Sequence, residues 1–194
     1  MNRSFTSEKY VIKRKGLSTD KFRLCAPNGD LLFYVEEKIK WTAPFTTTIC
    51  FYNDEKKTQE LLLARDGKGQ GYSNFLEVTD PATGQKVGGV GGDWTNFFED
   101  AWAILDAGNQ LVCTIRETST RRAILSQLSD GLVPQKLDFL IGNEVVGELR
   151  QKAVLVGHQL LVDFSKDSAR RVDRRLGLVA AIVIAAHQAT TEAD

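Results

Sequence analysis

The sequence predicts a mainly β protein, a closed antiparallel barrel of about twelve strands around a buried hydrophobic C-terminal helix. Two observations lead to this fold class. Short alternating apolar and polar runs, separated by glycine-rich turns, fill most of the chain before residue 165. Residues 173–188 then read as a helix, with no charged or polar side chain from Leu176 to Ala186. A helix that is apolar all round must be buried, and a sheet wrapped around it would bury it.

The strands are expected to follow one another as antiparallel hairpins, because polar turn residues separate nearly all of them. Asn28-Gly29 predicts a type I′ turn, which needs positive φ at both central positions. Residues 121–128 interrupt the pattern with apolar residues at helical spacing, which predicts a short helix. The expected strands are residues 9–15, 21–26, 31–39, 45–52, 61–65, 75–79, 86–90, 94–98, 101–105, 111–117, 135–141, 144–150 and 158–164.

Length and composition favour a single domain over residues 1–194, since barrels of this size are common. The 25 basic and 25 acidic residues balance, so no overall field attracts nucleic acid, and an anion site would have to be local. The uncharged part of the helix is shorter than the ~20 residues of a membrane span. The N-terminus lacks a secretory signal, which makes the cytoplasm the expected compartment. Cys25, Cys50 and Cys113 each lie in a strand-like run and are expected to be reduced core thiols.

Three stretches carry a resemblance to a known superfamily. They are residues 21–38 (KFRLCAPNGDLLFYVEEK), 101–119 (AWAILDAGNQLVCTIRETS) and 160–186 (LLVDFSKDSARRVDRRLGLVAAIVIAA). They resemble the tubby C-terminal-like superfamily of tubby domains, LURP-one-related proteins and phospholipid scramblases. The resemblance implies a closed barrel of twelve strands threaded by its C-terminal helix.

The resemblance does not assign a binding or metal-ligating role to any residue of this sequence. Tubby domains bind phosphoinositides through a lysine and an arginine, and this pair has no clear counterpart here. The proline-rich region and cysteine cluster of scramblases are absent. Asp163, Asp167 and Asp173 lie where scramblases have a calcium-binding segment, but they lack the dense oxygen spacing of a calcium loop. No metal or other cofactor is therefore predicted.

An arginine cluster directly before the apolar run is the candidate ligand-binding site. Its two pairs lie one helical turn apart, and so on one side if the helix begins early. Cations near a helix N-terminus oppose the helix dipole, so a negative group should compensate them. That group could be an anionic ligand such as a phosphate headgroup, held by guanidinium forks, or the carboxylates of Asp167, Asp173 and the rim. The cluster comprises Arg170, Arg171, Arg174 and Arg175.

No catalytic signature is present. The glycine-rich residues 67–71 and 88–92 are not followed by a helix pattern, and Ser73 lacks the context of a nucleophile elbow. His158 with Asp163 and a serine could form a hydrolase triad, the least supported hypothesis.

The leading prediction is a non-enzymatic cytoplasmic barrel, peripheral to the membrane, that binds an anionic or lipid-like ligand at its rim. A phosphoinositide or phospholipid headgroup is the expected ligand. The alternative is a structural or regulatory protein-interaction module without a small ligand.

Overall fold

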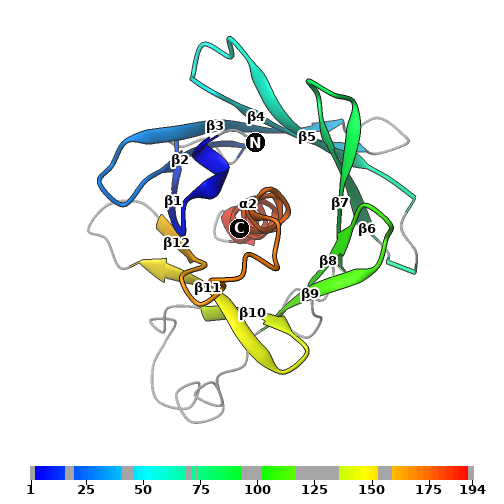
Figure 1. Cartoon of the computed structure of the whole chain (residues 1–194). Helices are drawn as coiled ribbons and strands as arrows, with labels where there is room; N and C mark the ends of the chain where they lie inside the picture. Colours follow the sequence, from blue (N-terminus) through cyan, green and yellow to red (C-terminus); the bar gives the residue numbers. More distant parts are fainter. Residues whose placement is uncertain are drawn as a thin grey trace.

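The computed structural model describes residues 3–15, 20–40, 46–68, 71–72, 74–92, 102–116, 136–152 and 159–191. Twelve antiparallel strands close into a barrel in which each strand pairs with the next along the chain and β12 returns to β1 (Figure 1). One C-terminal helix packs against the barrel. The predicted mainly β class and the closed barrel are confirmed.

The strand and helix bounds agree closely with the predicted ranges. The strands are β1 (Lys9–Arg14), β2 (Lys21–Cys25), β3 (Leu31–Lys40), β4 (Thr46–Tyr52), β5 (Glu60–Asp66), β6 (Asn74–Asp80), β7 (Gln85–Gly92), β8 (Trp102–Asp106), β9 (Leu111–Arg116), β10 (Lys136–Ile141), β11 (Glu144–Lys152) and β12 (Gln159–Asp163). A 3₁₀ helix, η1 (Arg3–Thr6), precedes β1, and the C-terminal helix is α2 (Arg174–Thr191). The predicted strand at 94–98 and helix at 121–128 lie outside the described residues.

The two ends of the barrel differ. At one end, called here the turn end, lie η1, the start of α2 and the connections that begin after β2, β4, β6, β8, β10 and β12, all of which are described. The other end, called the loop end, carries the connections that begin after β1, β3, β5, β7, β9 and β11. Every internal gap in the description falls in those connections. The arginine cluster lies in the connection between β12 and α2 and therefore at the turn end.

Helix α2 runs inside the ring of strands (Figure 1) and contacts β7, β8, β12 and η1. Its side chains from Leu178 to Ala186 are buried. Two glycines allow the helix to come close to its surroundings. A Cβ at Gly177 would lie 2.6 Å from the ring of Phe164, and one at Gly88 of β7 would lie 2.8 Å from Leu176 Cδ1. A larger residue at Gly177 would have to displace the ring of Phe164, and one at Gly88 would also meet the Leu105 carbonyl oxygen at 2.3 Å.

The inner faces of the strands carry large apolar side chains. On β3 and β4 these include Phe33, Val35, Ile49 and Phe51, all fully buried. Phe5 of η1 stacks on Phe33 with ring centroids 4.4 Å apart. The N-terminal 3₁₀ helix therefore closes part of the turn end by extending the aromatic core.

One turn prediction is wrong. Gly29 has a φ of 98°, but Asn28 does not take positive φ, so the β2–β3 connection is not a type I′ turn. Instead the Gly29 N–H donates to the Ala26 carbonyl at 2.9 Å, and Pro27 follows Ala26. Proline fixes the φ that the second residue of a type I turn requires, and glycine suits the fourth position. The register shift between Leu24 and Cys25 accompanies the longer connection.

The three cysteines are free and buried, as predicted. Burial raises the pKa of the Cys113 thiol to about 12. A thiol in this state is a poor nucleophile.

Candidate functional site

The arginine cluster lies in the segment that connects β12 to α2 at the turn end. The segment is attached to the N-terminus by the Phe164 N–H, which donates to the Glu8 carbonyl at 2.7 Å. Asp173 forms the N-cap of α2, because its side chain accepts the Arg175 N–H at 2.9 Å and its carbonyl accepts the Gly177 N–H at 3.1 Å. The helix therefore begins at Arg174, and the premise that Arg170 and Arg171 share a helical face with it is wrong.

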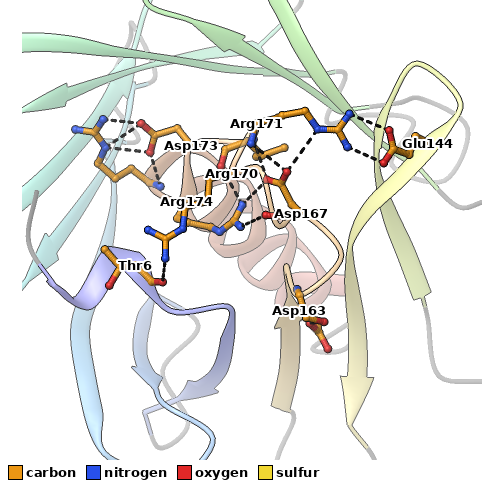
Figure 2. A network of polar contacts seen from close by, with 11 residues as sticks. Thr6, Glu144, Asp163, Asp167, Arg170, Arg171, Asp173 and Arg174 are labelled. Atoms are coloured by element: carbon orange, nitrogen blue, oxygen red, sulfur yellow. Dashed lines mark hydrogen bonds and ion pairs between the residues drawn. The ribbon is translucent and has the colours of Figure 1, made fainter.

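Asp167 is the centre of the network (Figure 2) and only 2% exposed. Its carboxylate accepts the Arg171 and Val172 backbone N–H groups, each at 3.0 Å, and Nη1 of Arg174 at 2.7 Å. Burial alone would raise the pKa of Asp167, but the hydrogen bonds from Arg174 and the two backbone groups outweigh it. The pKa lies below its ordinary value, and the side chain is a carboxylate at neutral pH.

Arg174 is engaged on several sides and only 3% exposed. Besides Asp167, its guanidinium donates to the Val172 carbonyl at 3.0 Å and to the Asp167 carbonyl at 3.1 Å. The guanidinium carbon lies 4.5 Å from the centroid of the Phe164 ring. Arg174 and Asp167 form a buried ion pair that holds the connection over the core, and Arg174 is not available to a ligand.

Two surface pairs flank this centre. The fork of Arg171 donates to both carboxylate oxygens of Glu144, the first residue of β11, at 2.8 and 2.7 Å. The two side chains are 38% and 59% exposed. Arg175 donates to Asp173 through Nε at 3.0 Å and through Nη2 at 2.5 Å. The hydrogen bonds from Arg171 lower the pKa of Glu144.

Arg170 differs from the other three. It takes a left-handed conformation with a φ of 52°, which is uncommon for a residue with a side chain. Its guanidinium donates to the Thr6 carbonyl at 3.3 Å, 164 residues away in the chain, and is exposed. Within the described part of the chain, no carboxylate forms an ion pair with it. Among the described residues, Arg170 is the cation of this cluster for which no carboxylate partner is found.

The sequence placed all four arginines at one rim, and the structure does bring them together. For three of the arginines the compensating groups are carboxylates of the protein itself. Arg171 pairs with Glu144, Arg174 with Asp167 and Arg175 with Asp173. Nothing in the local sequence around Arg171 pointed to Glu144, which lies on another hairpin.

The remaining sequence candidates form no site among the described residues. Asp163 accepts from Ser165 at 2.6 Å and pairs with Lys9 at 2.9 Å, so its carboxylate is occupied. Across the described ranges no three His, Cys, Asp or Glu side chains gather as a metal site would require. His158 and Ser73 lie outside the description. The glycine-rich residues 88–92 belong to β7.

Glu37 is a notable residue that the sequence analysis missed. It lies on β3 with 7% exposure, two residues beyond the core residue Val35. Burial, together with the nearby charge of Asp20, raises the pKa of Glu37 to about 7. Strand alternation from Phe33 and Val35 was a signal that could have placed this carboxyl on the inner face.

None of the helices in the described residues combines the length and apolar character needed to cross a bilayer. Comparison with models of protein families, with curated proteins and with solved structures found no match to this chain.

Proposed function

We propose that the protein is a non-catalytic, tubby-like barrel that binds the anionic headgroup of a phospholipid or phosphoinositide at its turn end, on the cytoplasmic face of a membrane. Arg170 and Arg171 are the proposed contacts. The observation that carries the proposal is the exposed guanidinium of Arg170, which has no carboxylate partner among the described residues and lies next to Arg171 in the chain.

The chemistry of Arg171 fits the same ligand class. Its fork already holds two carboxylate oxygens of Glu144 in the bidentate geometry with which arginine also holds phosphate. Both partners are substantially exposed and their attraction is screened by solvent, so the pair can be exchanged at low cost. A phosphate group carries more negative charge than the Glu144 carboxylate. It would displace Glu144 from Arg171 and would contact Arg170 at the same time. Arg174 and Arg175 serve the fold in this proposal, because each already has its own carboxylate.

The alternative is a protein-interaction module without a small ligand. It is favoured by the neutralised arginine pairs, and by two exposed leucines at the turn end. Leu31 is 39% exposed and Leu111 is 58% exposed. The two functions make opposite predictions for anion binding.

The double variant Arg170→Ala/Arg171→Ala is expected to bind anionic headgroups about tenfold more weakly or worse, because two charge-assisted contacts are lost. Binding is measured by cosedimentation with phosphatidylcholine vesicles that do or do not carry phosphatidylinositol bisphosphate, and by titration with soluble inositol trisphosphate. The matched control is Lys38→Ala/Arg65→Ala, which removes the same charge from exposed positions on β3 and β5. Wild-type binding should also weaken as salt rises.

The pattern of losses identifies the source of the anion. A loss in the vesicle assay alone supports a lipid surface, whereas a loss in both assays supports recognition of the phosphorylated headgroup itself. Equal binding by the arginine variant and the control, or no binding by the wild type, overturns the proposal and leaves the protein-interaction module.

Glu144→Gln is expected to tighten anion binding by a few fold, because it frees the fork of Arg171 from a competing carboxylate. The same titrations measure the effect. Loss of affinity in this variant would contradict exchange of Glu144 for the ligand, since the substitution removes only a negative charge.

A further inference from the structure

We propose that the outer face of β1 and β2 is a docking surface for an extended acidic segment of a partner protein. The surface, called here the basic block, comprises Lys13, Lys15, Lys21 and Arg23. It lies on the side wall of the barrel and shares no residue with the arginine cluster, so the inference is independent of the proposed function.

The first observation is that like charges lie side by side on two paired strands. Lys13 of β1 is directly opposite Arg23 of β2. The Lys15 N–H donates to the Lys21 carbonyl at 2.9 Å, which places these two lysines next to each other as well. Like charges opposite one another in a sheet are destabilising, so strand pairing alone does not favour this arrangement. Local conflicts of this kind are typical of functional sites.

All four cations of the basic block belong to the outer face of the wall. Along β2, Lys21 and Arg23 alternate with two fully buried apolar residues, so they lie on the face away from the core. Lys13 shares that face because it pairs with Arg23. The ammonium of Lys15 lies 5.1 Å from the centroid of the Tyr34 ring, and Tyr34 is the residue of β3 opposite Arg23.

The second observation is that the basic block holds a carboxylate of its own chain. Glu55, in the connection between β4 and β5, accepts from Lys15 Nζ at 2.8 Å and pairs with Nε of Arg23. Among the described residues, no carboxylate forms an ion pair with Lys13 or Lys21. Glu55 therefore occupies one part of the basic block and leaves two cations for another anion.

The other groups around the basic block do not remove its excess charge. Glu36, opposite Lys21, already accepts from Lys57 at 2.7 Å and from the Tyr34 hydroxyl at 3.0 Å. Asp20 adds one negative charge at the edge, and residues 16–19 contain no charged side chain. On the other side of β1, the residue opposite Lys13 is the neutral Gln159. Four cations thus meet the two carboxylates of Glu55 and Asp20, on a chain whose total charge balances.

The spacing of the cations points to an extended polypeptide as the partner. Lys13 and Lys15 are two residues apart, as are Lys21 and Arg23, which corresponds to about 6.6 Å along a strand. An extended segment with acidic residues at alternate positions presents its carboxylates at the same interval.

The contact with Glu55 shows how such a segment would bind. The ligand that the basic block already holds is the carboxylate of a polypeptide. The side chains of Lys15 and Arg23 are 38% and 45% exposed, so solvent screens both contacts and they can be exchanged at low cost. A partner would take the place of Glu55 and would contact Lys13 and Lys21 in addition.

Fluorescence anisotropy with a short labelled peptide, in which glutamate and threonine alternate, tests the docking surface on the intact chain. The wild type should bind the peptide, and more weakly as salt rises. Lys13→Gln/Lys21→Gln should lose about tenfold or more in affinity, because both cations are free to pair with the peptide. The matched control Arg65→Gln/Lys68→Gln removes the same charge from exposed positions and should bind like the wild type. No binding by the wild type, or equal losses in the two variants, overturns the proposal.

Glu55→Gln tests the exchange of the internal carboxylate. It should bind the peptide a few fold more tightly, because Lys15 and Arg23 are released from a competing anion. A weaker affinity would contradict the exchange. Thermal unfolding at low salt shows whether the free cations serve the fold. Lys13→Gln/Lys21→Gln should unfold at the wild-type temperature or above it, since repulsion between the strands is reduced, and a lower temperature would argue for a structural role and against docking.

Other anions test the commitment to an acidic protein segment. A peptide with the same glutamates in one uninterrupted run should bind several fold more weakly, because neighbouring residues of an extended segment face opposite sides. Equal affinity for the two peptides, or tighter binding of a single-stranded oligonucleotide or of phosphatidylserine vesicles, overturns the proposal in favour of a general polyanion surface. Arg170→Ala/Arg171→Ala should bind the peptide like the wild type, so failure of this proposal and failure of the proposed function are separate results.

Discussion

Asp167→Asn is expected to lower the free energy of unfolding by about 3–5 kcal/mol, the usual cost of removing one member of a buried ion pair. The amide keeps the size of the side chain but leaves the guanidinium of Arg174 without a counter-charge at 3% exposure. It also weakens the acceptor of the two backbone N–H groups that shape the segment before α2. Chemical denaturation at neutral pH measures the change.

Two controls isolate the buried charge. Glu144→Gln breaks an exposed, solvent-screened pair in the same network and should leave the free energy of unfolding nearly unchanged. Replacing Arg174 with Met in the Asp167→Asn background should recover part of the loss, because no unpaired charge then remains buried.

Because the pKa of Asp167 is depressed in the folded state, its stabilisation is present above the ordinary carboxyl pKa and is lost as pH falls through the depressed value. The wild type and Asp167→Asn should therefore converge in strong acid. An equal cost for Asp167→Asn and Glu144→Gln would refute the central role of the buried pair.

Ile182→Asp is expected to abolish cooperative folding. Ile182 lies on α2 with no exposed surface. The change removes about 1.5–3 kcal/mol of apolar burial and adds a carboxylate without a partner, which costs several kcal/mol more. Their sum is comparable to the whole net stability of a typical domain, about 5–15 kcal/mol. Loss of the thermal transition in circular dichroism is the expected readout.

The controls separate shape from charge. Ile182→Val removes one methylene and should cost about 0.5–1.5 kcal/mol. Leu111→Asp introduces the same charge at a side chain that is 58% exposed and should leave the stability nearly unchanged. A folded, cooperative Ile182→Asp protein would show that the helix does not depend on its contacts with the wall.

A strand such as residues 21–26 could be predicted because its outer face meets water and its inner face does not, so polar and apolar side chains alternate along it. The N-cap Asp173 and the apolar residues after it mark the helix equally well. The type of the β2–β3 turn was missed because Pro27 and Gly29 favour a type I arrangement over the Asn-Gly hairpin signal.

The arginine network was harder to predict because its pairings are not local. Arg171 meets Glu144 only because the β10–β11 hairpin ends beside the segment before α2. Arg174 is buried, although arginine is usually found at surfaces, because Asp167 and the ring of Phe164 surround its guanidinium. Which arginine stays exposed is decided by tertiary contacts that the order of residues does not reveal.

The order of the elements also bears on how the protein is made. All twelve strands leave the ribosome before α2 does, and β1 finds its second neighbour only when β12 appears. Until α2 emerges, the nascent chain therefore exposes a partly paired sheet whose apolar inner face is still uncovered. Such species are prone to aggregate. Helix α2 emerges after all twelve strands and completes the barrel interior, so a stop codon before residue 174 should yield insoluble product and not a smaller working barrel.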